Sequence, residues 1–179
     1  MHEYIGQRMK LCRQLAGLTE KQIAIACGDK RTVSAAWPYE RGDAVPSAEL
    51  LLKFAQVVTE STCSSDWLTV TPENKQVFLM GVRTIVRNRL IPTAKDYESA
   101  MYQRGWLLYK ASGMSSLYIA ERIGRQRHTL ARYLVGSNHL PLDVMIRFIR
   151  TCGGDPIDFF GPHEQFLDML TTIISNRIK

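Results

Sequence analysis

The chain contains an internal repeat, and a repeat constrains the fold of a sequence more than any single motif does. Gly17-Leu18-Thr19 recurs as Gly113-Met114-Ser115. At the same spacing, residues 20–28 have their counterpart in residues 116–124, including an isoleucine–alanine pair and a closing glycine. Matches that keep their order favour duplication of one unit over chance similarity between amphipathic helices.

The ends of the two copies match as well. Residues 78–90 align without a gap on residues 166–178, and six of the thirteen positions are identical. The repeat therefore predicts two domains, residues 1–91 and residues 92–179.

Apolar spacing predicts helices throughout both units. Ile23, Ala24 and Cys27 share one face of a short helix, because residues three and four apart lie above each other. Gly17 is typical of a helix end, and Thr19 can cap the helix that follows. In the first unit the expected helices cover residues 5–16, 19–28, 30–36, a stretch capped by Ser47, and residues 71–90. Alternating β-branched runs do not occur, so the sequence predicts an all-α protein.

The positive charge is unevenly distributed along the chain, whose formal net charge is +6. Residues 1–70 contain 8 Lys or Arg and 8 Asp or Glu. Residues 71–95 contain 5 basic and 1 acidic residue, and residues 96–179 contain 10 basic and 8 acidic residues. Residues 122–132 contain four arginines and His128. Such a cluster permits nucleic-acid binding, although a solvated helix face explains it equally well.

Several classes of protein are disfavoured. No apolar run reaches the roughly 18 residues of a membrane span, and the start of the chain does not resemble a secretory signal, so we expect a cytoplasmic protein. The four cysteines show no C-x-x-C spacing, which favours buried thiols over metal ligands. Asp155 and Asp158 are the nearest pair of carboxylates, and we expect them to cap a helix or turn. We therefore expect no enzyme, no metal and no cofactor.

Two short helices joined by a tight turn form the clearest motif, in residues 115–124 and 125–134. If Leu130 and Tyr133 point inward, the outward residues are Arg125, Gln126, Arg127, His128, Ala131 and Arg132. Arginine can bridge guanine through two acceptors, and glutamine can do the same for adenine. We therefore predict that this face contacts double-stranded DNA, with phosphate neutralisation alone as the alternative for Arg125 and Arg127.

Residues around this motif extend the candidate interface. The backbone amides near Ser115 and Ser116 can hold a phosphate, and Thr19 stands at the matching place in the first unit. Asn138 and His139 follow the second helix, where they are either phosphate contacts or solvent-exposed loop residues.

At these residues the chain resembles the Cro/CI-type (XRE-like) helix-turn-helix family of phage repressors, plasmid regulators and antitoxins. The family's G-L-T/S-x-x-x-L-A-x-x-L-G stretch is similar to residues 17–28 and 113–124. Its E-R-G triplet appears as Glu40-Arg41-Gly42, whereas the second unit keeps Gly136 alone of that triplet. The resemblance implies two tandem five-helix, lambda-repressor-like units whose third helices read base edges. It also implies a sequence-specific transcriptional regulator, most simply a repressor of phage, plasmid or other mobile-element genes.

The first unit departs from the family's pattern after residue 33. Pro38 cannot continue a helix, so the reading helix must stop by Trp37. With Val33 inward, the outward face is reduced to Lys30, Arg31, Ser34 and Ala35. Either this unit reads a different half-site, which makes the operator asymmetric, or it is mainly structural. The two cations at the helix start favour the first interpretation.

The last helix of each unit has a broad apolar face that must be buried. Its candidate interface residues are Phe78, Val82 and Ile85 in the first unit and Phe166, Leu170 and Ile173 in the second. These helices either pack onto their own units or also pair with each other, in an intramolecular pseudo-dimer or a homodimer. Paired units would read two half-sites about one helical turn apart.

Partners other than DNA follow from the alternative functions. An antitoxin or autoregulator would also bind a protein partner, and an activator would contact RNA polymerase. We expect no small-molecule ligand, because the two units leave no separate effector domain.

Overall fold

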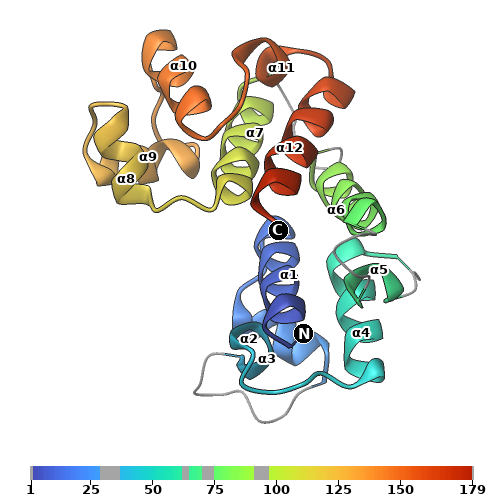
Figure 1. The fold of residues 1–179 in the computed structure, drawn as a ribbon. Coiled ribbons are helices and arrows are strands. Elements are labelled where there is room, and N and C mark those ends of the chain that lie inside the picture. Colours follow the sequence, from blue (N-terminus) through green and yellow to red (C-terminus); the bar gives the residue numbers. More distant parts are fainter. Residues whose placement is uncertain (1, 29–36, 62–64, 70–74, 91–96, 179) are drawn as a thin grey trace. The chain divides into compact units, whose positions relative to one another are not determined.

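The fold is all-helical wherever the structure describes it. A computed structural model describes residues 2–28, 37–61, 65–69, 75–90 and 97–178. The elements in these ranges are α-helices, α1 to α12 (Figure 1), which confirms the predicted all-α class. None of the described helices is long and apolar enough to cross a membrane.

The chain divides into two compact units, Met1–Asn88 and Arg89–Lys179, where the sequence predicted a boundary after residue 91. The helices of the first half are α1 (His2–Leu15), α2 (Glu20–Ala26), α3 (Pro38–Arg41), α4 (Ala48–Thr59), α5 (Asp66–Thr69) and α6 (Lys75–Leu90). Those of the second half are α7 (Tyr97–Ser112), α8 (Ser116–Arg122), α9 (Arg127–Leu134), α10 (Leu142–Thr151), α11 (Pro156–Phe160) and α12 (His163–Arg177). Except for the short α3, helices in the same order have similar lengths in both halves.

The number of helices differs from the five per unit that the family resemblance implies. A short helix, α5 or α11, precedes the last helix of each half. Asp155 caps α11, since its side chain accepts a hydrogen bond from the backbone N–H of Ile157 at 2.7 Å, and Pro156 follows in the first turn. In the first half, α3 begins at Pro38, directly after the place where the sequence predicted a helix end. The helix expected over residues 30–36 lies outside the described residues.

Local sequence explains where α7 ends and α8 begins. Gly113 adopts a left-handed backbone conformation with φ of 66°, which glycine enters without the steric penalty of a side chain. Ser115 then caps α8, because its hydroxyl accepts a hydrogen bond from the N–H of Tyr118 at 3.2 Å. Gly17 and Thr19 play the same parts between α1 and α2, with φ of 72° at the glycine.

A buried arginine fastens the helices of each half. Arg8 on α1 donates to the carbonyl of Leu68 at 3.1 Å, and its guanidinium carbon lies 4.5 Å from the ring centroid of Phe78. Arg104, at the matching place on α7, donates to the carbonyl of Phe159 at 2.6 Å and lies 5.0 Å from the ring of Phe166. In both halves the arginine therefore joins the first helix to the short helix and to the last one.

The candidate interface residues of the last helices lie in apolar surroundings. Ile173 is half-buried, and the others are buried: Phe78, Val82, Ile85, Phe166 and Leu170. Phe78 packs on Trp67 of α5, with ring centroids 6.0 Å apart, and Phe166 packs on Phe159 of α11 at 5.7 Å. These contacts match packing of each last helix on its own unit, and pairing between the two helices stays a prediction.

Candidate nucleic-acid interface

The turn between α8 and α9 sets the direction of the second helix. Gly124 follows α8 with φ of 67°, and the N–H of Arg125 donates to the carbonyl of Ala120 at 2.9 Å. Gln126 is extended, with φ of −80° and ψ of 150°, and stands at the N-cap of α9. The glycine closes the first helix and the extended residue starts the second, so the chain reverses within a few residues.

Two buried residues fix the rotation of α9 about its axis. Leu130 and Tyr133 are buried, as the apolar spacing predicted. The ring of Tyr133 packs against Phe148 of α10 with centroids 5.6 Å apart, and its hydroxyl donates to the sulfur of Met145 at 2.9 Å. Burial raises the pKa of this phenol above its usual range, which keeps it a neutral hydrogen-bond donor.

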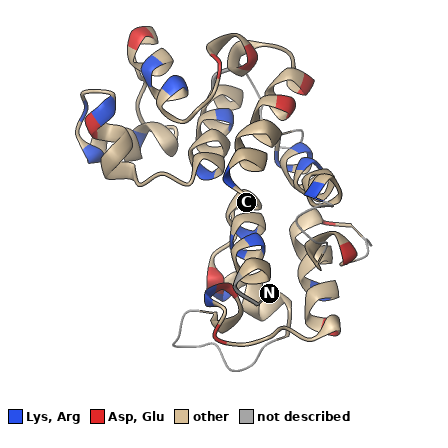
Figure 2. Cartoon of the chain, viewed as in Figure 1, with Lys and Arg blue, Asp and Glu red and all other residues tan. Residues whose placement is uncertain are grey.

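The opposite face of α9 is open to solvent. Four of its residues are exposed, namely Arg127, His128, Ala131 and Arg132, and Arg125 and Gln126 are exposed just before it. Figure 2 shows Lys and Arg on α8 and α9 and on the neighbouring α10. The predicted contact residues between Arg125 and Arg132 therefore lie on one helix face and the turn that leads into it.

A hydrogen bond joins the starts of the two helices. The Nε of Arg127, the first residue of α9, donates to the hydroxyl of Ser116, the first residue of α8, at 3.0 Å. The side chain of Arg127 is exposed, and a guanidinium carries further donors at Nη1 and Nη2 that suit a phosphate or a guanine.

The loop after α9 is fastened to α7. Asn138 is exposed, and Nδ1 of His139 lies 2.8 Å from the hydroxyl of Tyr102. The N–H of Ser137 donates to the carbonyl of Arg132 at 2.8 Å. Tyr102 was missed by the sequence analysis, because nothing in the local pattern links α7 with a loop that follows it by more than thirty residues.

Arg147 on α10 was missed as well. Its Nη1 lies 3.7 Å from the point where a Cβ on Gly124 would stand, so this side chain reaches the turn between α8 and α9. It also forms an exposed ion pair with Asp143 at 2.9 Å. The apolar spacing of α10 places Arg147 outward, and that signal was available in the sequence.

In the first unit, Thr19 caps the N-terminus of α2. Its hydroxyl accepts from the N–H of Gln22 at 3.2 Å, and the side chain of Gln22 accepts from the N–H of Thr19 at 2.8 Å. This reciprocal capping box satisfies backbone donors that a phosphate would otherwise bind. The other predicted contacts of this unit, Lys30, Arg31, Ser34 and Ala35, lie outside the described residues.

The E-R-G triplet has a structural role in the first unit. Glu40 is buried, and its two carboxylate oxygens accept from Nε and Nη2 of Arg13 at 2.6 and 2.8 Å. A third donor of Arg13 reaches the carbonyl of Leu18 at 2.8 Å. This pair joins α3 to α1 and to the start of the turn before α2.

The described cysteines are buried thiols. Cys12, Cys27 and Cys152 are buried and form no disulfide, and burial raises the pKa of Cys152 to about 12. A thiol with so high a pKa stays protonated and is a poor nucleophile. Within the described part of the chain, no group of three or more His, Cys, Asp or Glu side chains is placed to hold a metal ion.

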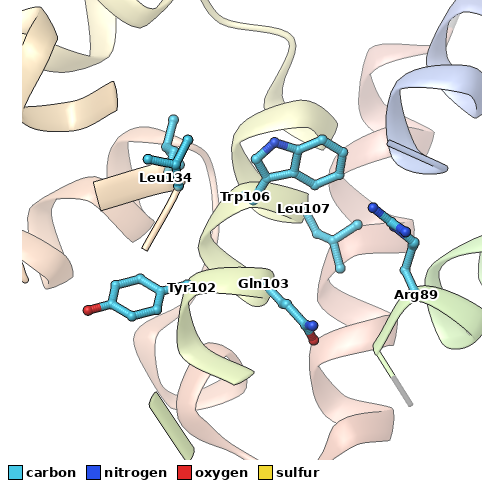
Figure 3. A pocket seen from close by; sticks show the side chains of 7 residues that line it. Arg89, Tyr102, Gln103, Trp106, Leu107 and Leu134 are labelled. Atoms are coloured by element: carbon cyan, nitrogen blue, oxygen red, sulfur yellow. The ribbon is translucent and has the colours of Figure 1, made fainter. Parts of the chain in front are cut away.

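A hollow lies beside α7, where Tyr102, Gln103, Trp106 and Leu107 line it together with Leu134 at the end of α9 (Figure 3). Aromatic rings, an amide and aliphatic groups make up this part of the wall. None of these five side chains is a carboxylate, a thiol or an imidazole, so they offer no pair for acid–base or nucleophilic chemistry. The hollow is a packing feature next to the second helix of the motif.

No family model, curated protein or solved structure matches the chain. Among the described residues, Arg127, His128 and Arg132 form an exposed row on α9. It combines three cationic or imidazole side chains with a helix whose other face is locked in the core.

Proposed function

We propose that the protein is a sequence-specific double-stranded DNA-binding transcriptional regulator. The outward row of Arg127, His128, Ala131 and Arg132 on α9 carries this proposal. A single helix fits the major groove of B-DNA, and arginine is the side chain that most often distinguishes guanine there. The buried Leu130 and Tyr133 support the proposal, because a reading helix must hold its outward face in one orientation.

The regulatory output that fits this arrangement best is repression. A protein that occupies an operator by its reading helix can exclude polymerase without a further effector site. The tandem order of similar helices supports two related units, and α8 and α9 of the second have the layout of a helix-turn-helix module. We place the protein among regulators of phage, plasmid or other mobile-element genes, on the resemblance described from the sequence.

Selection of bound sites from a random duplex pool tests the proposal. We expect the full-length chain to enrich one site with fixed bases over three to six neighbouring positions, since one helix reaches roughly that many base edges. Replacement of Arg132 by alanine should relax the preference at one of these positions. Enrichment of no site at low salt would overturn sequence-specific DNA binding.

A second function is favoured by one observation on α8. Leu117 and Tyr118 are 56% and 42% exposed, and the matching residues of α2 are Lys21 and Gln22. Exposed apolar side chains on the outer face of a short helix are typical of protein contacts. An activator that contacts RNA polymerase, or an autoregulatory antitoxin that binds a protein partner, would use this face. Leu117→Gln with Tyr118→Gln, which adds no charge, would abolish that contact and leave DNA affinity unchanged.

A further inference from the structure

The two halves differ at the residue that begins the first helix of the motif. Ser116 begins α8, and its hydroxyl accepts the hydrogen bond from Arg127 at 3.0 Å. Glu20 begins α2 at the matching place in the repeat. Its Oε2 accepts from the backbone N–H of Trp37 at 3.2 Å, and its Oε1 lies 3.6 Å from Nη2 of Arg13. At this repeat position the second half therefore has a neutral hydroxyl, and the first half has a carboxylate.

The carboxylate of Glu20 is held in place and remains open to solvent. Its side chain is 41% exposed. Trp37, which it anchors through the backbone, is buried, and its ring stacks on Phe54 with centroids 5.7 Å apart. Glu20 therefore fastens the segment after residue 36 to α2 and at the same time presents negative charge at the start of that helix.

The net charge of the residues around these positions is also less positive in the first unit than in the second. Residues 115–135 contain four arginines and one glutamate, a balance of +3. The matching residues 19–39 contain three Lys or Arg and two Asp or Glu, a balance of +1. Phosphates of a duplex are attracted to the first surface and repelled by an exposed carboxylate on the second.

We infer that DNA contact is confined to the second unit, and that the carboxylate of Glu20 excludes the phosphate backbone from the first. This inference rests on the proposed function. One chain then reads one half-site, and an operator with two half-sites takes two chains. We then expect an operator with two similar half-sites, each read by α9 of one chain, in place of the asymmetric operator predicted from the sequence.

Paired alanine variants of the full-length chain test this division of roles. Arg125→Ala with Arg127→Ala should reduce the affinity, and it should reduce the slope of log affinity against log salt by about 0.9 for each of the two that contacts a phosphate. Lys30→Ala with Arg31→Ala, which removes two cations from the first unit, should leave the affinity and the slope unchanged. An equal reduction in both variants would overturn the inference. No DNA binding by the unsubstituted chain would overturn the proposed function, and the inference with it.

A single substitution at the distinguishing position tests the role of the carboxylate. Ser116→Glu gives the second unit the side chain of the first, and we expect roughly tenfold or greater loss of DNA affinity. Ser116→Ala is the control, which removes the hydroxyl without adding charge and should retain most of the affinity. Far-ultraviolet circular dichroism of both variants reports whether the helices are retained. Equal affinity of folded Ser116→Glu and Ser116→Ala would overturn the inference.

Discussion

Single residues divide into those that hold the units together and those that face solvent, and the E-R-G triplet contains both kinds. Glu40 is buried in a two-point ion pair with Arg13, whereas Arg41 is exposed and pairs with Asp43 at 2.7 Å. The second half has Leu134 and Val135 at the matching positions. Leu134 is half-buried and Val135 is exposed, so the second unit has no buried charge pair at this place.

Glu40→Gln should destabilise the first unit. The substitution leaves the guanidinium of Arg13 buried without its carboxylate, and breaking a buried pair in this way costs about 3 kcal/mol of unfolding free energy. Urea denaturation followed by circular dichroism measures the loss. Glu49→Gln, which breaks the exposed pair with Lys53 on α4, is the control and should have no measurable effect. Equal stability of the two variants would contradict a structural role for Glu40.

Arg127→Ala should weaken DNA binding by roughly 1–3 kcal/mol and relax one position of the selected site. The loss follows from the position of Arg127 at the start of α9, where its side chain is exposed to solvent. Binding of the variant to singly substituted sites distinguishes its role. A uniform loss across all sites would assign Arg127 to the phosphate backbone, and an unchanged affinity would contradict its place in the interface.

At the scale of elements, the packing of α9 on α7 decides how the outward row is presented. A Cβ on Gly105 of α7 would stand 2.5 Å from the hydroxyl oxygen of Tyr133 and 3.0 Å from its Cε1 and Cζ atoms. Glycine at this place allows the two helices to approach, and Tyr133 fills the space. The orientation of α9 therefore depends on Gly105 of α7.

Gly105→Ala should reduce both stability and DNA affinity. Although alanine has the higher helix propensity, by about 1 kcal/mol, the added methyl group overpacks the contact, at a cost of about 1–3 kcal/mol. Thermal unfolding and DNA titration measure the two effects. The double variant Gly105→Ala with Tyr133→Phe removes the closest atom and should recover part of both losses. A higher thermal stability of the Gly105→Ala variant would show that α9 moves to accommodate the methyl group at no cost, which would contradict the prediction.

Local signals predicted the elements better than the contacts between them. The helix end at Gly17 and the cap at Thr19 follow from backbone chirality and from hydrogen bonding within a few residues, and the structure confirms them. The helices α5 and α11 are too short to show an apolar period. The bonds from Tyr102 to His139 and from Arg127 to Ser116 link distant positions, which no local pattern encodes.

The whole molecule consists of two units with matching internal frameworks and different surfaces. Arg8 and Arg104 occupy matching places. Each donates to a backbone carbonyl of the short helix and lies against a phenylalanine ring of the last helix in its own half. By contrast, the position that begins α2 carries a carboxylate, and the matching position of α8 carries a neutral hydroxyl. The two units therefore share contacts in their cores and differ at exposed residues, where surfaces are constrained by partners rather than by packing.

The salt dependence of DNA binding distinguishes the number of units that contact the duplex. Arg122 and Arg125 are exposed in the second unit beside Arg127 and Arg132, for which base contacts are predicted. Two phosphate contacts give a slope of log affinity against log salt of about −1.8 for one chain on one half-site. Two chains on a paired site give about −3.6. Titration between roughly 50 and 300 mM salt measures the slope, and sedimentation of the complex counts the chains. A slope near −3.6 with a single chain bound would assign contacts to both units, and would favour the asymmetric operator over two identical half-sites.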